Sequence, residues 1–252
     1  MSLNILFLGT GADDRRLLPQ EKDFIQKDKR RCSAAIVNGH ILFDCGPHII
    51  NALTVAKIEF SAITDIVLTH LHKDHFDVNS VNAIAKENPD LRLWFREDSV
   101  FTETPKCKLI PMKLFEEYSV GELLITAVPA NHSAYPQHIS VKCGEKSLFY
   151  GLDGGWFLNE SVRYMKNKEY DIFITDATVG DYIGDFRIGE HNSIPMIRMM
   201  VPSLKTLNII NKNTKIVLSH LAVCLHKPHE EICRQTESDG FVIAYDGLEL
   251  LI

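Results

Sequence analysis

Three histidines and one aspartate lie within seven residues of this chain, in the segment THLHKDH at positions 69–75. The apolar, β-branched run at 65–69 predicts a buried strand that ends where the histidines begin. Neutral imidazole nitrogens and ionised carboxylates are the ligands that Zn, Mn and Fe accept, whereas a solvated surface has no reason to hold them so close together. The segment therefore predicts a metal-binding loop at the end of a strand. A histidine-rich surface turn is the alternative.

The spacing within this loop divides its side chains between two ions. His70 and His72 stand two residues apart, so in an extended chain they point to the same side and can share one ion. Asp74 and His75 follow after a turn and are expected to point toward a second ion nearby. Two such cations would lower the pKa of a shared water so that hydroxide exists near neutral pH. A pair about 3.5–4 Å apart can hold both the attacking and the leaving oxygen.

Three more apolar strands end in a residue of the same kind. His132, Asp153 and His220 each come directly after one. Taken singly, each could be a hydrogen-bonded core histidine or a helix-capping aspartate, but strand ends at one edge of a sheet meet in space and can complete a shared site. The simplest assignment gives His70, His72 and His132 to a first ion, Asp74, His75 and His220 to a second, and Asp153 to both.

Three further residues are placed to support such a site. Asp44 and Asp176 end apolar strands without fitting the ligand count, so we expect them to fix the tautomers of ligand histidines. His191 precedes the apolar run 194–201, where a helix should begin, and there it could bind a phosphate oxygen or protonate a leaving group. A solvated loop histidine is the alternative. The remaining histidines are expected at the surface or at helix ends: His40, His48, His138, His226 and His229.

Apolar runs bounded by turn residues alternate with runs of helical spacing, which predicts an α/β fold. Strands are expected at 4–8, 33–37, 41–44, 65–69, 91–95, 108–111, 123–128, 139–142, 147–150, 171–176 and 214–220, and helices at 49–58, 78–85 and 194–201. A closing hairpin is expected at 240–250, around an Asp-Gly turn. The 252 residues are expected to form one domain, residues 1–252.

The polar stretch at 12–31 ends in the basic run QKDKRR. We expect it to be a solvated excursion, and a basic patch that steers phosphate is the alternative. The turn before it, Gly9-Thr10-Gly11, lacks a third glycine at the dinucleotide-binding spacing, so no Rossmann site is expected.

The charge balance limits the partners of the chain. With 27 Lys and Arg against 33 Asp and Glu, the formal net charge is −6, which argues against capture of long nucleic acid but suits a small anionic substrate held by metal. No basic leader and no apolar run of membrane-spanning length is visible, so a cytoplasmic protein without membrane contact is expected. The six cysteines form no Cys-x-x-Cys pair, which is typical of free thiols in a reducing compartment. A homodimer is left open.

With His-x-His-x-Asp-His at 70–75, followed by His132, Asp153 and His220, the chain resembles the metallo-β-lactamase superfamily. That resemblance implies a four-layer αβ/βα sandwich with a binuclear metal site on the upper edge of its two sheets. Smaller motifs resemble the cyclic phosphodiesterases associated with carbon–phosphorus lyase operons, which are similar to tRNA 3′-processing endonucleases. These motifs are found at 9–11, 43–46, 176–178, 191–193 and 240–247, and the likeness covers essentially the whole chain.

Two departures change what the resemblance implies. The phosphodiesterases often hold a structural zinc with a cysteine cluster that follows the first glycine turn. No cysteine occurs in the segment 12–31 of this chain, so no third, structural zinc is expected. The tRNA endonucleases carry a long basic exosite arm that has no counterpart of its size here, which makes transfer RNA a less favoured substrate.

We therefore expect a binuclear metal-dependent phosphodiesterase that hydrolyses a small, preferably cyclic, nucleotide or sugar phosphate diester with a metal-bridging hydroxide. Asp74 and His191 are its expected catalytic residues, the latter acting on the departing oxygen. The ligand set permits two ions of Mn, Zn or Fe, and the resemblance favours Mn. The alternatives are a thioesterase or lactonase of the glyoxalase II kind, a tRNA 3′-processing-like nuclease, and a metal-stabilised binding protein without turnover.

Overall fold

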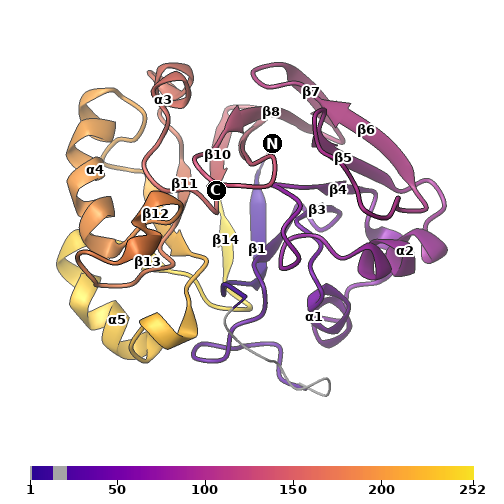
Figure 1. Ribbon diagram of the computed structural model, residues 1–252, viewed down its shortest axis with the longest axis horizontal. Coiled ribbons are helices and arrows are strands. Elements are labelled where there is room, and N and C mark those ends of the chain that lie inside the picture. The colour runs from indigo at the N-terminus through magenta and orange to yellow at the C-terminus, as the bar shows by residue number, and fades with distance from the viewer. Residues whose placement is uncertain (1, 14–21) are drawn as a thin grey trace.

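Fourteen strands form two sheets in the computed structural model, which describes residues 2–13 and 22–252 (Figure 1). The strands of the first sheet are β1 (Asn4–Gly9), β2 (Ala34–Val37), β3 (Ile41–Phe43), β4 (Asp65–Val67), β5 (Arg92–Arg96), β6 (Lys108–Met112) and β14 (Glu249–Leu251). Those of the second are β7 (Glu117–Val120), β8 (Leu123–Pro129), β9 (Gln137–Cys143), β10 (Lys146–Gly151), β11 (Ile172–Asp176), β12 (Lys215–Ser219) and β13 (Val242–Ile243). The strand orders are β14-β1-β2-β3-β4-β5-β6 and β13-β12-β11-β10-β9-β8-β7.

The two sheets pack face to face over one buried core. Alternate residues of each strand point into it, among them Phe43 from the first sheet and Tyr150 and Ile174 from the second. The rings of Phe43 and Tyr150 meet edge to face, 5.2 Å apart. Burial of each such side chain contributes about 1.5–3 kcal/mol, which makes this core the main source of cohesion between the sheets.

Helices cover the outer faces of both sheets (Figure 1). The helices are α1 (Ile49–Val55), α2 (Val78–Glu87), α3 (Asn159–Met165), α4 (Ile194–Thr206) and α5 (His229–Thr236). Apolar side chains of α1 and α2 pack on the first sheet, and those of α3, α4 and α5 pack on the second. The order of layers is therefore helix, sheet, sheet, helix, and the expected αβ/βα sandwich is confirmed. Among the described residues, no helix combines the length and the apolarity that a membrane span needs.

Parallel pairing brings several strand ends to one edge of each sheet. In the first sheet β3, β4, β5 and β6 run parallel, and in the second β10, β11, β12 and β13 do. Carboxyl ends of neighbouring parallel strands lie side by side, and binding residues collect there in α/β folds. The predicted ligands follow such ends.

The basic end of the stretch 12–31 is only partly solvated, contrary to expectation: residues 27–29 are exposed, whereas Gln26, Arg30 and Arg31 are buried. Residues 14–21 of that stretch lie outside the described residues, but Arg30 and Arg31 are 3% and 0% exposed. Arg31 donates to Asp246 Oδ2 at 3.3 Å and to the carbonyl oxygens of Asp23 and Phe24. The guanidinium donors of Arg31 find their acceptors inside the protein, so its charge alone did not predict its burial.

The expected closing hairpin at 240–250 is also wrong. β13 pairs with β12 in the second sheet, whereas β14 pairs with β1 in the first. The chain crosses from one sheet to the other at Asp246, which is fully buried and accepts hydrogen bonds from Thr10 and Arg31. Tertiary contacts therefore override the local Asp-Gly signal.

Candidate metal centre

The loop at 69–75 is fixed between a strand and a capped helix. It leaves β4, and its last turn is closed by the N–H of His75, which donates to the carbonyl of His72 at 2.9 Å. Asp77 then caps α2, accepting hydrogen bonds from the N–H groups of Asn79 and Ser80. His70 and His75 are 2% and 0% exposed. These contacts fix the backbone on both sides of the imidazoles.

The predicted ligands come together in two clusters. In the first, His72 Nδ1 lies 3.0 Å from His70 Nε2 and 3.1 Å from His132 Nε2. The second contains Asp74, His75, Asp153 and His220, whose ligand atoms all lie within 4.8 Å of one another. Strand ends that are up to 150 residues apart in the sequence (220 − 70 = 150) therefore meet as expected.

Asp153 lies between the two clusters. Its Oδ2 is 2.5 Å from His75 Nε2 and 3.1 Å from His220 Nε2, both in the second cluster, and 3.5 Å from His70 Nε2 in the first. Burial disfavours the charged carboxylate, but His220 and His75 outweigh burial and hold the pKa of Asp153 well below its usual value. An ionised oxygen facing both groups of imidazoles is the arrangement that a bridging ligand requires.

Burial favours the neutral, metal-binding form of two histidines in the first cluster. It lowers the pKa of His70 well below its usual value, and His75 lowers it further. Burial likewise lowers the pKa of His132. Because metals bind the neutral imidazole, these histidines need not lose a proton before they bind. The donor set of nitrogen and carboxylate oxygen fits divalent Mn, Zn or Fe.

Two buried carboxylates contact the outer ring nitrogens of ligand-type histidines. Asp44 Oδ2 accepts from His75 Nδ1 at 2.8 Å, which leaves His75 Nε2 free to face the cluster. Asp176 Oδ2 lies 3.0 Å from His191 Nδ1 and 3.4 Å from His220 Nδ1. Both aspartates thus lie where a tautomer-fixing group is needed.

Thr178 is a contact of the site to which the sequence reasoning gave no role. Its Oγ1 lies 2.7 Å from His220 Nδ1 and donates to Asp176 Oδ2 at 2.9 Å. It stands two residues beyond the strand end that Asp176 marks, within the motif 176–178 that contributes to the family resemblance.

Three of these side chains are aimed by unusual backbone geometry. Asp44, Asp153 and His220 have φ values of 62°, 49° and 58°, in the left-handed region that non-glycine residues rarely adopt. Each such residue costs about 1–2 kcal/mol. The sharp turn directs the side chain across the strand end into the clusters, so the surrounding contacts must hold it there.

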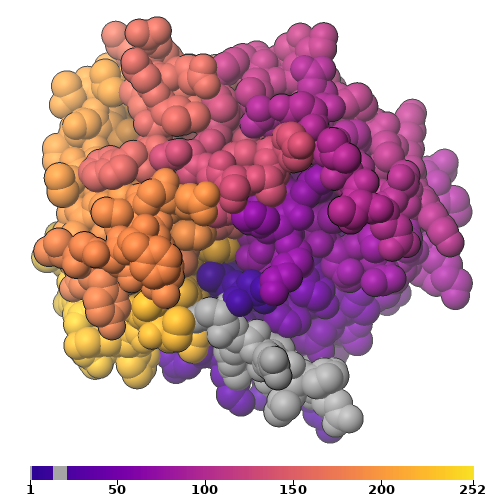
Figure 2. All heavy atoms as spheres, in the orientation of Figure 1, coloured from indigo at the N-terminus to yellow at the C-terminus, as the bar shows by residue number. Residues whose placement is uncertain are grey.

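His191 lies beside the second cluster in a cavity of about 320 Å³. Its Nδ1 is 3.2 Å from Asp153 Oδ1, and 17% of its side chain is exposed. Burial disfavours its cation, but Asp176 more than compensates and raises the pKa of His191 above its usual value. The cavity is lined by Ala12, Asp13, His72, Asp74, His132, Asp153, Thr178, Arg187, Glu190, His191, His220, Cys224 and Leu225. In Figure 2 the orange and purple surfaces of the two halves of the chain meet beside the indigo N-terminal segment.

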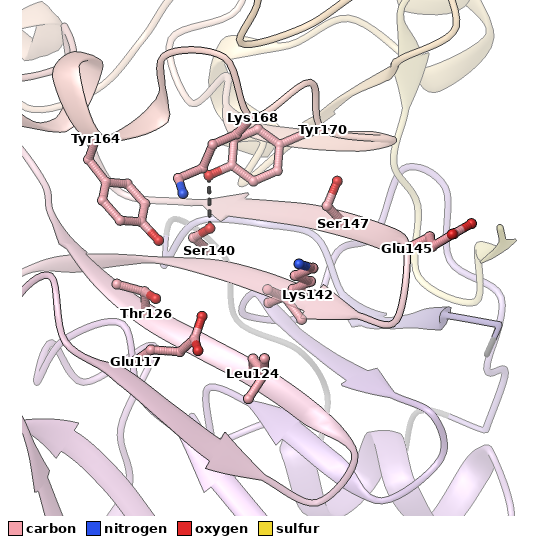
Figure 3. A pocket seen from close by; sticks show the side chains of 11 residues that line it. Glu117, Leu124, Thr126, Ser140, Lys142, Glu145, Ser147, Tyr164, Lys168 and Tyr170 are labelled. Atoms are coloured by element: carbon pink, nitrogen blue, oxygen red, sulfur yellow. Dashed lines mark hydrogen bonds between the residues drawn. The ribbon is translucent and has the colours of Figure 1, made fainter.

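A second cavity, of about 260 Å³, lies on the outer face of the second sheet (Figure 3). It is lined mainly by polar side chains of β8, β9 and the segment before β11. Ser140 and Tyr170 close its floor with a hydrogen bond of 2.8 Å. None of the predicted site residues lines it, so the cavity at the strand ends remains the candidate site.

His138 is buried, contrary to the expectation of a surface or helix-end residue. It is 2% exposed in β9, and its ring packs edge to face on Phe149 and Phe157, with centroids 5.5 and 5.8 Å away. Because both faces of the second sheet are covered, the alternation of side chains along β9 does not reveal an exposed face. His229, at 4% exposure, is buried as well, but it is the first residue of α5 and therefore lies at a helix end, as expected.

This burial predicts a pH-dependent stability. Burial lowers the pKa of His138 to about 4, against 6.5 in the unfolded chain. As the pH falls from 6.5 toward 4, the unfolded chain takes up the proton first, so the stabilisation that is complete above pH 6.5 is lost. In chelator-treated protein, we expect the free energy of unfolding of wild type minus that of His138→Leu to fall by up to about 3 kcal/mol over this window. Urea unfolding at a series of pH values measures this difference. A difference that stays constant between pH 6.5 and 4 would contradict the prediction.

Comparison with known proteins agrees with the fold. The family model described as Beta-lactamase superfamily domain matches residues 40–203, more than half of the chain. The metallo-β-lactamase fold protein YhfI from Bacillus subtilis superposes with a TM-score of 0.74 at 12% identity, covering 100% of this chain and 99% of that one. A diphosphatase from the PhnP family gives 0.72 at 18% identity, covering 100% and 98%.

The short form of human tRNase Z gives a TM-score of 0.65 at 18% identity, covering 98% of both chains. No curated protein matches the sequence significantly. The match of the family model confirms the resemblance that the histidine motif indicated. The chain therefore belongs to the β-lactamase superfamily and is a metal-dependent hydrolase of the metallo-β-lactamase fold.

Proposed function

We propose that the chain is a binuclear phosphodiesterase that hydrolyses a small, preferably cyclic, nucleotide or sugar phosphate diester. The observation that carries the proposal is the position of Asp153 between two clusters of imidazoles, with His191 beside it. The proposed ligands are His70, His72 and His132 for one ion, Asp74, His75 and His220 for the other, and Asp153 for both. When bound, two divalent cations would lower the pKa of a water and neutralise the oxygens of the phosphoryl group.

The chain's own residues would prepare the site for such a diester. Asp44 holds the Nδ1 proton of His75, which fixes the orientation of that ring. Asp176 contacts His191 and raises its pKa, which favours the protonated imidazole that would act as proton donor to the departing oxygen. Asp74 completes the second cluster and is 8% exposed at the edge of the cavity.

Two solved relatives support a phosphate ester over a thioester or lactone, since one is named a diphosphatase and another a tRNase. A thioesterase has no need for the proton donor His191, because a thiolate departs without one. A paired assay on bis(p-nitrophenyl) phosphate and a thioester, with Mn²⁺ added, tests the choice. Turnover of the thioester alone would reject the phosphodiesterase, and cleavage of precursor tRNA in preference to small cyclic diesters would favour the nuclease.

We expect His191→Ala to lower kcat by about 10²–10⁴-fold for a cyclic nucleotide, whose alkoxide leaves poorly without a proton. The loss should be much smaller for bis(p-nitrophenyl) phosphate, because p-nitrophenolate leaves readily. Steady-state kinetics on both substrates checks this, with His40→Ala as a control, because His40 contacts Glu122 and Thr64 away from the cavity. Equal losses on both substrates would remove the proton-donor role.

We further propose that residues 1–252 form one hydrolase domain, because a single core joins the two sheets. Manganese is the proposed working metal, with zinc and iron compatible with the same donors. The absence of a third, structural zinc stays a prediction, since residues 14–21 of the relevant segment lie outside the described residues. We propose a cytoplasmic location, which agrees with the absence of a disulfide among the described residues.

A further inference from the structure

The turn that carries Asp153 is packed too tightly for any residue but glycine at position 154. A Cβ atom added to Gly154 would lie 2.6 Å from His138 Nε2 and 2.8 Å from His138 Cε1. His138 cannot easily yield, because Phe149 and Phe157 flank its ring. The buried imidazole thus forms the floor beneath the Asp153 turn.

Asn192 also contacts the turn that carries Asp153. Its Nδ2 donates to the carbonyl oxygen of Gly154 at 2.9 Å, and its backbone N–H donates to Asp176 Oδ1 at 2.9 Å. Its own carbonyl accepts from the N–H of Val179 at 3.1 Å. One residue, 1% exposed, therefore connects the turn of Asp153 with the carboxylate that contacts His191 and His220.

The Oδ1 atom of the Asn192 amide forms no favourable polar contact. Its Oδ1 is buried and has no hydrogen-bond partner among the described residues. An unpaired buried acceptor costs about 1–3 kcal/mol. The favourable contribution of this side chain is therefore the hydrogen bond to Gly154.

We propose that Asn192 is a positioning residue of the metal centre. Its amide, together with the floor that His138 provides, fixes the left-handed turn that places Asp153 between the two clusters. A bridging carboxylate must reach both ions, and metal ligands tolerate displacements of only about 0.5 Å or less. This inference rests on the binuclear site of the proposed function, and the ligand of that site is a pair of divalent cations.

The first test is calorimetric titration of metal-free protein with Mn²⁺. We expect wild type to bind two ions, and Asn192→Ala to bind the weaker one about 10–100-fold less tightly. The matched control is Ser193→Ala, which removes the N-cap hydrogen bond to the N–H of Met196 in α4. That change costs about 1 kcal/mol of stability but touches nothing at Gly154. Its titration should therefore equal that of wild type even though its melting temperature falls.

The second test does not depend on Asn192. We expect Gly154→Ala to weaken Mn²⁺ binding in the same way, and the double variant Gly154→Ala/His138→Ala to restore it, because the smaller side chain makes room for the new methyl group. Failure of the second change to rescue binding would overturn the proposed floor.

The two proposals fail in different ways. If wild type binds two ions and Asn192→Ala titrates identically, Asn192 has no positioning role and the phosphodiesterase proposal stands. If wild type itself does not bind two ions, the binuclear site is wrong.

Discussion

Replacing Asp153 by asparagine is expected to reduce hydrolysis of a cyclic diester by at least about 10³-fold, because a shared anionic ligand is worth several kcal/mol of transition-state stabilisation through the cations it holds. The amide keeps the shape of the side chain but loses the charge that faces His75, His220 and His70. We expect kcat/KM to fall and the number of bound Mn²⁺ ions, measured by metal analysis of the dialysed protein, to fall with it.

The control for this change is Asp181→Ala. Asp181 forms an exposed ion pair with Arg198 at 3.2 Å, and such surface pairs contribute about 0–1 kcal/mol. Its activity and metal content should stay at the wild-type level. Full metal content and activity in Asp153→Asn would show that Asp153 does not bridge, and the two clusters would then have to act separately.

The largest effect on stability is expected for Arg31→Ala, which should lower the free energy of unfolding by about 3–5 kcal/mol. Arg31 and Asp246 are both fully buried, and the guanidinium also donates to Asn51 and to two carbonyl oxygens. Burial raises the pKa of Asp246 to about 7, and the hydrogen bonds from Arg31 and Thr10 oppose this rise. Without Arg31, these acceptors lose their donors inside the protein.

Urea unfolding of metal-free protein at neutral pH measures this effect. Lys27→Ala is the matched control, because its ion pair with Glu230 is solvent-exposed and should contribute about 0–1 kcal/mol. A loss in Arg31→Ala as small as that in Lys27→Ala would mean that the buried contacts of Arg31 contribute no more to stability than an exposed ion pair.

The sequence predicted that the candidate ligands lie together because their signal is local. A histidine or aspartate directly after an apolar run identifies a strand end, and parallel strands bring such ends to one edge. His132, Asp153 and His220 could therefore be placed with the 70–75 loop without knowledge of the strand order. The family model and the structural neighbours confirm the fold that this motif indicated.

The features that the sequence did not predict depend on contacts with residues far away in the chain. Arg31 is buried because Asp246, 215 residues away, accepts its hydrogen bonds. The same contacts direct the chain from β13 to β14 instead of closing a hairpin. The sequence predicted a surface or helix-end position for His138, because nothing in β9 shows that helices cover the outer face of its sheet. The charge of a segment and the alternation of apolar and polar residues along a strand describe one element at a time. They do not show which distant elements pack against it.

The connection between β6 and β7 divides the chain into two parts. The first part forms most of the first sheet, the second part forms the second sheet, and each part carries some of the candidate ligands. Four ligands precede that connection and three follow it, while β14 returns from the second part to pair with β1 of the first. Two fragments separated there would each carry an incomplete ligand set, and neither alone should bind metal as the whole chain does. The strand that crosses back could dock the fragments together, so recovery of metal binding would provide a readout for a split-protein complementation reporter.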